Sequence, residues 1–181
     1  CISSAASDVY KRQDPESTWY RKEGFGKHDW LYCMLLNYGG NVGLHGKMKH
    51  VIDEFYKAKT SSFGKTMKGV GMTMEGSENN PVMFELLCEL PWRPARFDKD
   101  EWLKNYTVAR YGKADKAVQD AWLLLSNTIY NCPAKNTQQG THESVFCGRP
   151  DYDVYQVSSW SEMEPYYKPE DCLLYTSDAA D

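Results

Sequence analysis

The stretch HDWLYCMLLNYGG, from His28 to Gly40, is a nearly continuous run of apolar and aromatic residues that ends in two glycines. Such a run predicts a strand buried on both faces, as in a parallel sheet. Beyond the glycines, apolar residues recur at helical spacing until Ser61, Ser62 and Gly64 interrupt them. The recurring positions are Leu44, Met48, Val51, Ile52 and Phe55. This part of the chain therefore predicts a strand followed by an amphipathic helix.

A second strand and helix follow in the same order. The segment KGVGMTM, Lys68 to Met74, is a short strand candidate that ends at Glu75. Asn80 and Pro81 then supply an N-cap residue and a first-turn proline. The helix that they open has one apolar stripe, at Met83, Leu86, Leu87 and Leu90. Two strand–helix units in series predict a parallel α/β architecture.

The pattern changes near Pro94, and from Asp98 to Tyr130 only helices are expected. Asp98 and Glu101 form a capping-box-like start for a helix that ends at Gly112, and Asp115 opens the next helix. The apolar stripes are Trp102, Tyr106 and Ala109 in the first helix, and Val118, Ala121, Trp122, Leu125 and Ile129 in the second. We therefore expect a domain boundary near Pro94, with one domain at 14–93 and another at 94–171.

The two ends of the chain, residues 1–13 and 172–181, have no apolar periodicity and are related through their coding DNA. The reverse complement of codons chosen for SSAASDVYKRQ, shifted by one base, translates to CLLYTSDAAD. An untrimmed sequencing adapter produces this relation, because the same DNA sequence is then translated from opposite strands at the two ends. We expect both ends to be artefactual tails that pack against nothing, and the natural sequence to be a piece of a longer gene, about Asp14 to Asp171.

Composition and charge exclude several classes of protein. A hydrophobic content of 41% with six Trp residues is that of a globular protein, not of a disordered one. The net charge of −4, the pI near 5.6 and the scatter of Lys and Arg among acidic residues argue against a nucleic-acid partner. No apolar run is long enough to span a bilayer, and no signal peptide is visible.

The cysteines and histidines indicate no metal site. Two of the six cysteines lie in the tails, and Cys33 and Cys88 lie in apolar runs, which predicts that both are small core residues. Cys132 and Cys147 flank a polar loop, which suits either a disulfide or two free thiols. No Cys-x-x-Cys pair and no ligand-spaced histidine cluster is present in the sequence.

The glycine-rich segment YGGNVGLHGK, Tyr38 to Lys47, does not have the spacing of a phosphate-binding loop. Asn41 stands where a Walker A motif requires its first glycine, and Met48 stands where the motif requires the Mg²⁺-binding hydroxyl. The glycines are better explained by a tight turn from the strand into the helix that follows.

Glu75 is the strongest candidate for chemistry. It stands at the C-terminal end of a short strand, where (β/α)8 barrels carry their active sites. A carboxylate there can act as a nucleophile or as a general acid/base, but strand-end acids also cap helices. Glu78, three residues later, is the local competitor, and spacing alone does not choose between the two.

Aromatic and amide side chains of the first strand and its turn are candidate sugar-binding groups. Aromatic rings stack on the apolar faces of sugars, and amides can bond to hydroxyl or acetamido groups. The candidate set is Trp30, Leu35, Asn37, Tyr38 and Asn41, with Tyr32 as a further aromatic residue. The alternative is that the aromatic residues of a buried strand belong to the core.

Three stretches carry a resemblance to a known family. DWLYCMLLNYGGNVGLHG, GVGMTMEGSENNPVMFELLCELPWR and ARYG…AWLLLSNTIYNC resemble, in this order, segments of the family 89 glycoside hydrolases, the α-N-acetylglucosaminidases. The likeness runs through most of Trp30 to Pro150. It implies an α/β fold, with the C-terminal βα units of a (β/α)8 barrel (the seventh and eighth strands) followed by the start of an all-α domain, and it implies an incomplete fragment.

The resemblance also implies a reaction without a cofactor. The family hydrolyses terminal α-linked N-acetylglucosamine with retention of configuration, and its nucleophile is the glutamate of a Met-x-x-Glu-Gly motif, here Glu75. The general acid/base follows an Asn on an earlier barrel strand, upstream of Asp14. The isolated fragment should therefore be inactive, although the full-length protein should be an enzyme. Leu36 and Val42 stand where some relatives have histidines, which leaves the finer substrate preference open.

Further expectations follow from the family. Its members act in secreted, periplasmic or lysosomal settings that permit disulfides, so we predict a bond between Cys132 and Cys147. The expected partner is a glycan with a terminal α-N-acetylglucosamine. We expect the Glu75 carboxylate to face the same cavity as Trp30 or Tyr38, with Glu78 directed toward the following helix.

Two other functions compete with this one. The first is a non-catalytic carbohydrate-binding or interaction module, and the second is a different (β/α)8 glycosidase. An upstream strand that ends in Asn-Glu would favour the enzyme, and its absence would favour the binding module.

Overall fold

The computed structural model describes residues 18–26, 28–36, 44–74, 80–133, 156–158, 161–162, 166–168 and 170. Both expected tails lie outside these residues. The elements in chain order are α2 (Thr18–Arg21), η1 (Glu23–Phe25), β1 (Trp30–Leu36), α3 (Met48–Thr60), η3 (Ser62–Thr66), β2 (Met67–Met74), α4 (Pro81–Glu89), η4 (Leu90–Trp92), α5 (Lys99–Tyr111), α6 (Lys116–Asn127), β3 (Gln156–Ser158) and β4 (Ser161–Glu162).

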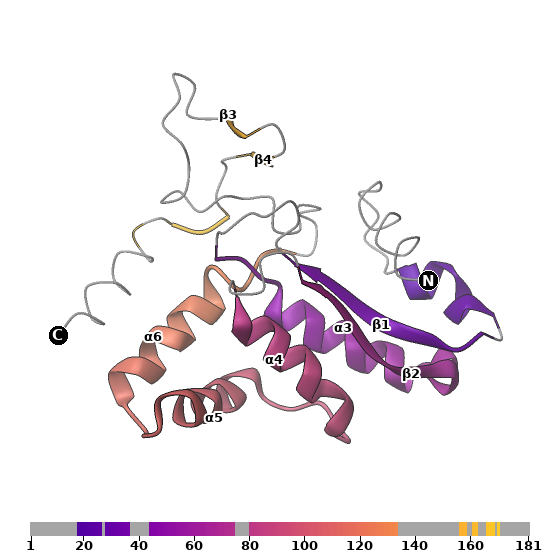
Figure 1. Ribbon diagram of the computed structural model, residues 1–181, viewed down its shortest axis with the longest axis horizontal. Helices are drawn as coiled ribbons and strands as arrows, with labels where there is room; N and C mark the ends of the chain where they lie inside the picture. The colour runs from indigo at the N-terminus through magenta and orange to yellow at the C-terminus, as the bar shows by residue number, and fades with distance from the viewer. Residues whose placement is uncertain are drawn as a thin grey trace.

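β1 and β2 form a parallel two-stranded sheet, and α3 is the crossover between them (Figure 1). The paired residues run from Trp30 with Met67 to Leu36 with Met74, with a shift of register between Trp30 and Leu31. The predicted order of strand, helix, strand and helix is therefore confirmed. The first helix begins later than its apolar pattern does, because Leu44 precedes α3 and is 40% exposed.

β1 is buried on one face only. Trp30, Met34 and Leu36 are at most 7% exposed, whereas Leu31 is 46% exposed and Cys33 is exposed as well. Side chains alternate between the two faces of a strand, and the described helices cover only one of these faces. The predictions of a strand buried on both faces and of a core Cys33 are wrong for this chain, because no described element covers the second face.

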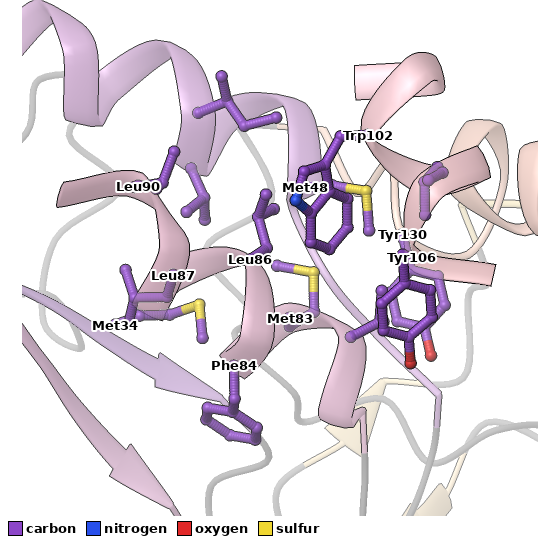
Figure 2. Packing of buried hydrophobic residues seen from close by; sticks show 14 of the residues in the cluster. Met34, Met48, Met83, Phe84, Leu86, Leu87, Leu90, Trp102, Tyr106 and Tyr130 are labelled. Atoms are coloured by element: carbon purple, nitrogen blue, oxygen red, sulfur yellow. The ribbon is translucent and has the colours of Figure 1, made fainter. Parts of the chain in front are cut away.

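Helix α4 is the centre of the main core. Met83, Leu86, Leu87 and Leu90 are 0% exposed, as the predicted stripe requires. Figure 2 shows α4 between Met34 of β1 and the aromatic rings of Trp102, Tyr106 and Tyr130. The prediction that Cys88 is a core residue is wrong, because Cys88 falls on the outer face of α4 and is exposed.

The helical pair α5 and α6 begins where its capping residues predict. The Asp98 Oδ1 accepts a hydrogen bond from the Glu101 N–H at 2.8 Å, and the Asp115 Oδ1 accepts one from the Ala117 N–H at 3.0 Å. Gly112, with a φ of 78°, ends α5 in the left-handed conformation that glycine adopts readily. Both predicted helix starts and the predicted stop are confirmed.

A chain of aromatic rings joins the helical pair to the core. The ring centroids of Trp102 and Tyr106 are 5.5 Å apart, those of Tyr106 and Trp122 are 5.1 Å apart, and those of Trp122 and Tyr130 are 6.3 Å apart. Rings at these separations gain packing energy beyond their buried area. Ala109, which was expected in the stripe, is exposed. The buried face of α5 is completed by Leu103 and Thr107 instead.

Candidate active site

The uncovered face of the sheet carries glycines at alternate positions of β2. Gly69 and Gly71 pair with Leu31 and Cys33 of β1. A Cβ atom on Gly71 would lie 2.8 Å from the Cys33 Sγ, and one on Gly69 would lie 3.7 Å from the Leu31 Cδ2. All four residues therefore share one face, which we call the inner face. This face leads along both strands toward the loops that follow them.

Most of the candidate site residues belong to those two loops. Glu75 directly follows β2 and Asn37 directly follows β1, while Tyr38 and Asn41 come further along the first loop. These four residues, and the competitor acid three residues after Glu75, lie outside the described residues. Leu35 is part of β1 at its carboxyl end. Because neighbouring parallel strands end at the same edge of a sheet, the two loops start side by side.

Trp30 lies at the opposite end of β1. It is 6% exposed and stacks on Trp19, with ring centroids 6.3 Å apart and ring planes at 9°. Its indole N–H donates to the Thr66 Oγ1 at 3.2 Å. As the first residue of β1, Trp30 closes the amino end of the sheet. The buried ring of Trp30 belongs to the core, which contradicts its assignment to substrate binding. Of the two aromatic residues expected beside Glu75, Trp30 is therefore not supported, and Tyr38 lies outside the described residues.

Tyr32 also belongs to the core. It lies on the same strand face as Trp30, and its ring meets the ring of Phe55 edge-on with centroids 5.6 Å apart. Burial raises the pKa of the Tyr32 hydroxyl, and the negative charge of Glu54 adds to the rise. Of the two interpretations of the strand aromatics, the structure supports the core for both residues that it describes.

Buried polar contacts around Asn80 hold the carboxyl end of the sheet. Asn80 is 1% exposed and precedes α4 in a left-handed conformation, with φ 55° and ψ 45°. The sequence predicts that the Asn80 side chain caps α4, but the structure shows no such hydrogen bond. Its Oδ1 instead accepts hydrogen bonds from the His45 N–H at 3.1 Å and from the Tyr130 O–H at 3.0 Å. One oxygen thus joins the segment before α3 and the start of α4 to the segment after α6.

Backbone pairing adds to this junction. The Met48 N–H at the start of α3 donates to the Tyr130 carbonyl at 2.8 Å, and the Cys132 N–H donates to the Gly46 carbonyl at 3.0 Å. An isolated antiparallel bridge forms between the same two segments. A Cβ atom on Gly46 would lie 2.8 Å from the Tyr130 Cδ1, so only glycine fits there. Residues 129–132 therefore lie against residues 45–48.

Tyr166 reaches the same junction from much later in the chain. Its hydroxyl donates to the Ile129 carbonyl and lies 3.2 Å from the His45 Nδ1. The rings of Tyr166 and His45 meet edge-on, with centroids 5.9 Å apart. Burial raises the pKa of the Tyr166 hydroxyl, so the group stays a neutral donor at physiological pH.

Cys132 borders the junction as a buried free thiol. Burial raises the pKa of this thiol to about 11, so at neutral pH it is protonated and unreactive. Burial also lowers the pKa of the neighbouring Lys47 ammonium group. The predicted disulfide between Cys132 and Cys147 is not formed, and Cys147 itself lies outside the described residues.

Comparison with known proteins gives the family. Residues 7–94 match the family model described as the alpha-N-acetylglucosaminidase (NAGLU) tim-barrel domain, and residues 102–177 match the model of the alpha-N-acetylglucosaminidase (NAGLU) C-terminal domain. Human alpha-N-acetylglucosaminidase is 32% identical over 168 residues, which is 92% of this chain and 22% of the human protein. The chain belongs to the α-N-acetylglucosaminidase family.

Solved structures agree with this placement in the family. A family 89 glycoside hydrolase from Clostridium perfringens in complex with 2-acetamido-1,2-dideoxynojirimycin has a TM-score of 0.79 and 27% identity, covering 91% of this chain and 18% of that chain. The same figures hold for a Clostridium perfringens variant with two Glu-to-Gln substitutions, in complex with its substrate GlcNAc-α-1,4-galactose.

These matches confirm the predicted fold class of this α-N-acetylglucosaminidase-family chain. It comprises two βα units of a (β/α)8 barrel followed by helices of an all-α domain. The chain spans about a fifth of the length of the relatives that it matches, 22% of the human protein and 18% of the bacterial one.

Neither a metal-binding cluster nor a membrane-crossing helix is found within the described part of the chain. There, no group of three or more His, Cys, Asp or Glu side chains could hold a metal ion. No described helix combines the length and the apolar character that crossing a membrane requires.

The contacts of Asn80 are a structural feature of this region that the sequence does not predict. His45 and Tyr130 lie 35 and 50 residues away from Asn80 in the chain, so no local sequence pattern predicts these hydrogen bonds. The inner face, by contrast, could have been predicted from the sequence of β2. Gly69 and Gly71 alternate with Val70 and Met72 in the sequence, and this period of two separates the two faces of the strand.

Proposed function

We propose that this chain is part of a retaining glycoside hydrolase that removes terminal α-linked N-acetylglucosamine, with Glu75 as the catalytic nucleophile. The observation that carries the proposal is that Glu75 directly follows β2, a parallel barrel strand, within the Met-x-x-Glu-Gly motif. This edge of the sheet holds the active site in (β/α)8 enzymes. The bacterial relative with bound GlcNAc-α-1,4-galactose, its substrate, supports the substrate class.

The alternation of β2 supports a direction for the Glu75 side chain. Successive side chains of a strand point to opposite faces, and Gly69 and Gly71 belong to the inner face. Thr73 and Glu75 continue this series at every second position. If the alternation of the strand continues by one residue beyond Met74, the Glu75 carboxylate would face inward, toward the side on which a complete barrel would close.

Two carboxyl groups divide the chemistry of a retaining glycosidase. One attacks the anomeric carbon and forms a covalent intermediate, while the other protonates the leaving oxygen and then activates a water, with the two groups about 5–5.5 Å apart. Glu75 supplies the first carboxyl group, and an earlier barrel strand outside this chain supplies the second. The two Glu-to-Gln substitutions in the substrate complex of the bacterial relative are in line with a two-glutamate mechanism. We therefore expect this chain alone to be inactive.

We assign sugar recognition to the end of β1 and the loop after it. Leu35 and Asn37 follow Leu31 and Cys33 at every second position of the sequence, so continued alternation would direct both to the face proposed for Glu75. Tyr38 offers an aromatic face to the sugar ring, and the amides of Asn37 and Asn41 can bond the acetamido and hydroxyl groups. Leu35 supplies an apolar wall beside them.

The domain division and the location belong to the same proposal. The two family models leave a gap between residues 94 and 102, which supports a boundary near Pro94, with barrel residues at 14–93 and helical-domain residues at 94–171. A secreted, periplasmic or lysosomal location is proposed on the basis of the family.

The experiment that tests the function uses the full-length protein that contains this chain. We expect it to hydrolyse an aryl α-N-acetylglucosaminide and to release the α-anomer first, as proton NMR can record before the sugar mutarotates. Release of the β-anomer first would contradict a nucleophilic Glu75. Sugar binding without hydrolysis would support a binding module, and hydrolysis of a different aryl glycoside only would support another barrel glycosidase.

A further inference from the structure

We infer that Asn80 and Tyr130 are positioning residues that hold both active-site loops of the barrel from the helical domain. The inference rests on the proposed function, because it concerns the loop that carries Glu75. Neither residue touches the substrate in this arrangement. Each acts through the backbone that it holds in place.

Asn80 fixes the downstream end of the loop that carries Glu75. Residues 75–79 run from the end of β2 directly into Asn80, so the position of Asn80 limits where that loop can lie. The positive φ of 55° is one that Asn adopts more readily than most residues. Its side chain is 1% exposed and is bound at two points through one oxygen. Buried polar groups with satisfied hydrogen bonds make the backbone around them more rigid.

The same oxygen fixes the loop that follows β1. The His45 N–H, which donates to the Asn80 Oδ1, lies just downstream of residues 37–43. The upstream ends of both loops are already fixed, because β1 and β2 pair with each other along their length. Removal of this single acceptor would therefore loosen the downstream ends of both loops together, although the backbone bonds at Gly46 and Met48 would still hold the segment before α3.

Tyr130 brings the helical domain into this arrangement. Its ring stacks on Trp122 of α6 with an interplanar angle of 18°, and its carbonyl caps the Met48 N–H at the start of α3. The ring and the backbone are thus held independently of the hydroxyl. The hydroxyl then donates to Asn80 at 3.0 Å. The helical domain contacts the junction of the loops through a directed bond as well as through apolar packing.

The first test replaces single hydroxyl groups in the full-length protein. Tyr130→Phe removes the bond to Asn80 and keeps the stacked ring. Tyr111→Phe is the matched control, because the Tyr111 hydroxyl accepts from the Trp122 indole N–H at 3.3 Å, a bond inside the helical pair. Since small displacements of a reacting group are costly in rate, we expect Tyr130→Phe to lower kcat about tenfold with little change in KM. Tyr111→Phe should leave both constants unchanged.

The second test changes the acceptor itself. Asn80→Ala removes it, and we expect kcat to fall by about 100-fold, because both loops lose the bond that they share. Asn80→Asp keeps a side-chain oxygen on a residue that tolerates the left-handed conformation, and should recover most of the lost kcat. Rates are measured at a temperature where circular dichroism shows every variant fully folded. A purely structural role would lower the unfolding midpoint and leave the kcat of the folded protein intact.

The outcomes distinguish a failure of the positioning role from a failure of the proposed glycosidase function. An active wild type with normal kcat in both Tyr130→Phe and Asn80→Ala would overturn the positioning role alone. Equal losses of kcat in Tyr130→Phe and Tyr111→Phe would also overturn it, because the loss would then follow from any missing hydroxyl. A wild-type protein without activity on the aryl substrate would overturn the proposed function and, with it, this inference.

Discussion

The two ends of the β1–β2 sheet are built from different chemistry. At the amino end, Trp30 packs on Trp19 and Phe25, with ring centroids 6.3 and 5.7 Å away. At the carboxyl end, Asn80 binds His45 and Tyr130 through buried hydrogen bonds. Apolar burial stabilises without fixing a direction, whereas a bound amide fixes the atoms around it. We therefore expect the amino end to contribute mainly stability and the carboxyl end to position the proposed catalytic groups.

The largest expected effect falls on the carboxyl end. In the full-length protein, Glu75→Ala should lower kcat by several orders of magnitude without unfolding the protein, because the covalent step loses its nucleophile. Added azide should restore part of the activity on an activated substrate and give a product of inverted configuration. Steady-state rates, circular dichroism and NMR of the product measure these outcomes.

Glu78→Ala is the matched control for this substitution. It should cost some stability and much less rate, because an acid in the turn before α4 acts on the helix and not on the sugar. Near-normal turnover in Glu75→Ala combined with lost turnover in Glu78→Ala would reverse the assignment of these two acids.

The next largest effect falls on the amino end. Trp30→Ala should lower the free energy of unfolding by about 3–5 kcal/mol, because it empties a core position. The kcat of the folded variant should match that of the wild type. Trp92→Ala is the control, since Trp92 is 86% exposed and its loss should change stability by only about 0.5 kcal/mol. A raised KM in folded Trp30→Ala would indicate that Trp30 contributes to substrate binding. It would contradict the expected difference between the two ends of the sheet.

The smallest effect is expected at the ion pair of Asp53 and Arg96, which belongs to neither end of the sheet. Partial burial opposes ionisation of Asp53, but bonds from Lys49 and Arg96 hold the pKa of its carboxyl group below the usual value. A lowered pKa stabilises the fold at neutral pH, and this contribution is lost as the pH falls through that pKa. Because the pair is partly exposed, Arg96→Gln should cost less than about 1 kcal/mol at pH 7.

Urea unfolding of the wild type and of Arg96→Gln at several pH values measures the difference between their free energies of unfolding. It should shrink as the buffer becomes more acidic than the lowered pKa of Asp53, while kcat at neutral pH stays unchanged. A difference that grows toward acidic pH would contradict the ion-pair explanation.

The elements of this fold were predictable because their signals are local. The stripe of α4 and the capping residues Asp98 and Asp115 each lie within a few residues of the structure that they specify. The coverage of a strand face depends instead on what packs against it. Cys33 has apolar neighbours in the sequence and is nevertheless exposed, because its face of the sheet is uncovered in the described chain.

The candidate site was predictable only in part, for a related reason. The proposal for Glu75 depends on the motif of the family, because local spacing alone does not separate Glu75 from Glu78. An aromatic residue such as Trp30 suits a sugar platform and a core equally well, so its role depends on contacts with Trp19 and Thr66. Asn80 looked like a helix cap because Pro81 follows it, whereas its actual partners come from distant parts of the chain.

The central claim, that Glu75 forms a covalent bond to the sugar, is tested by trapping that bond in the full-length protein. A 5-fluoro-α-N-acetylglucosaminyl fluoride has a good leaving group, but its ring fluorine destabilises the oxocarbenium-like transition states, so the glycosyl–enzyme persists. After an acid quench and trypsin digestion, the peptide of residues 69–96 contains both Glu75 and Glu78, because Arg93 is followed by proline. Fragment-ion mass spectrometry should place the added sugar on Glu75. A sugar on Glu78, or on a peptide outside 69–96, would contradict the assignment.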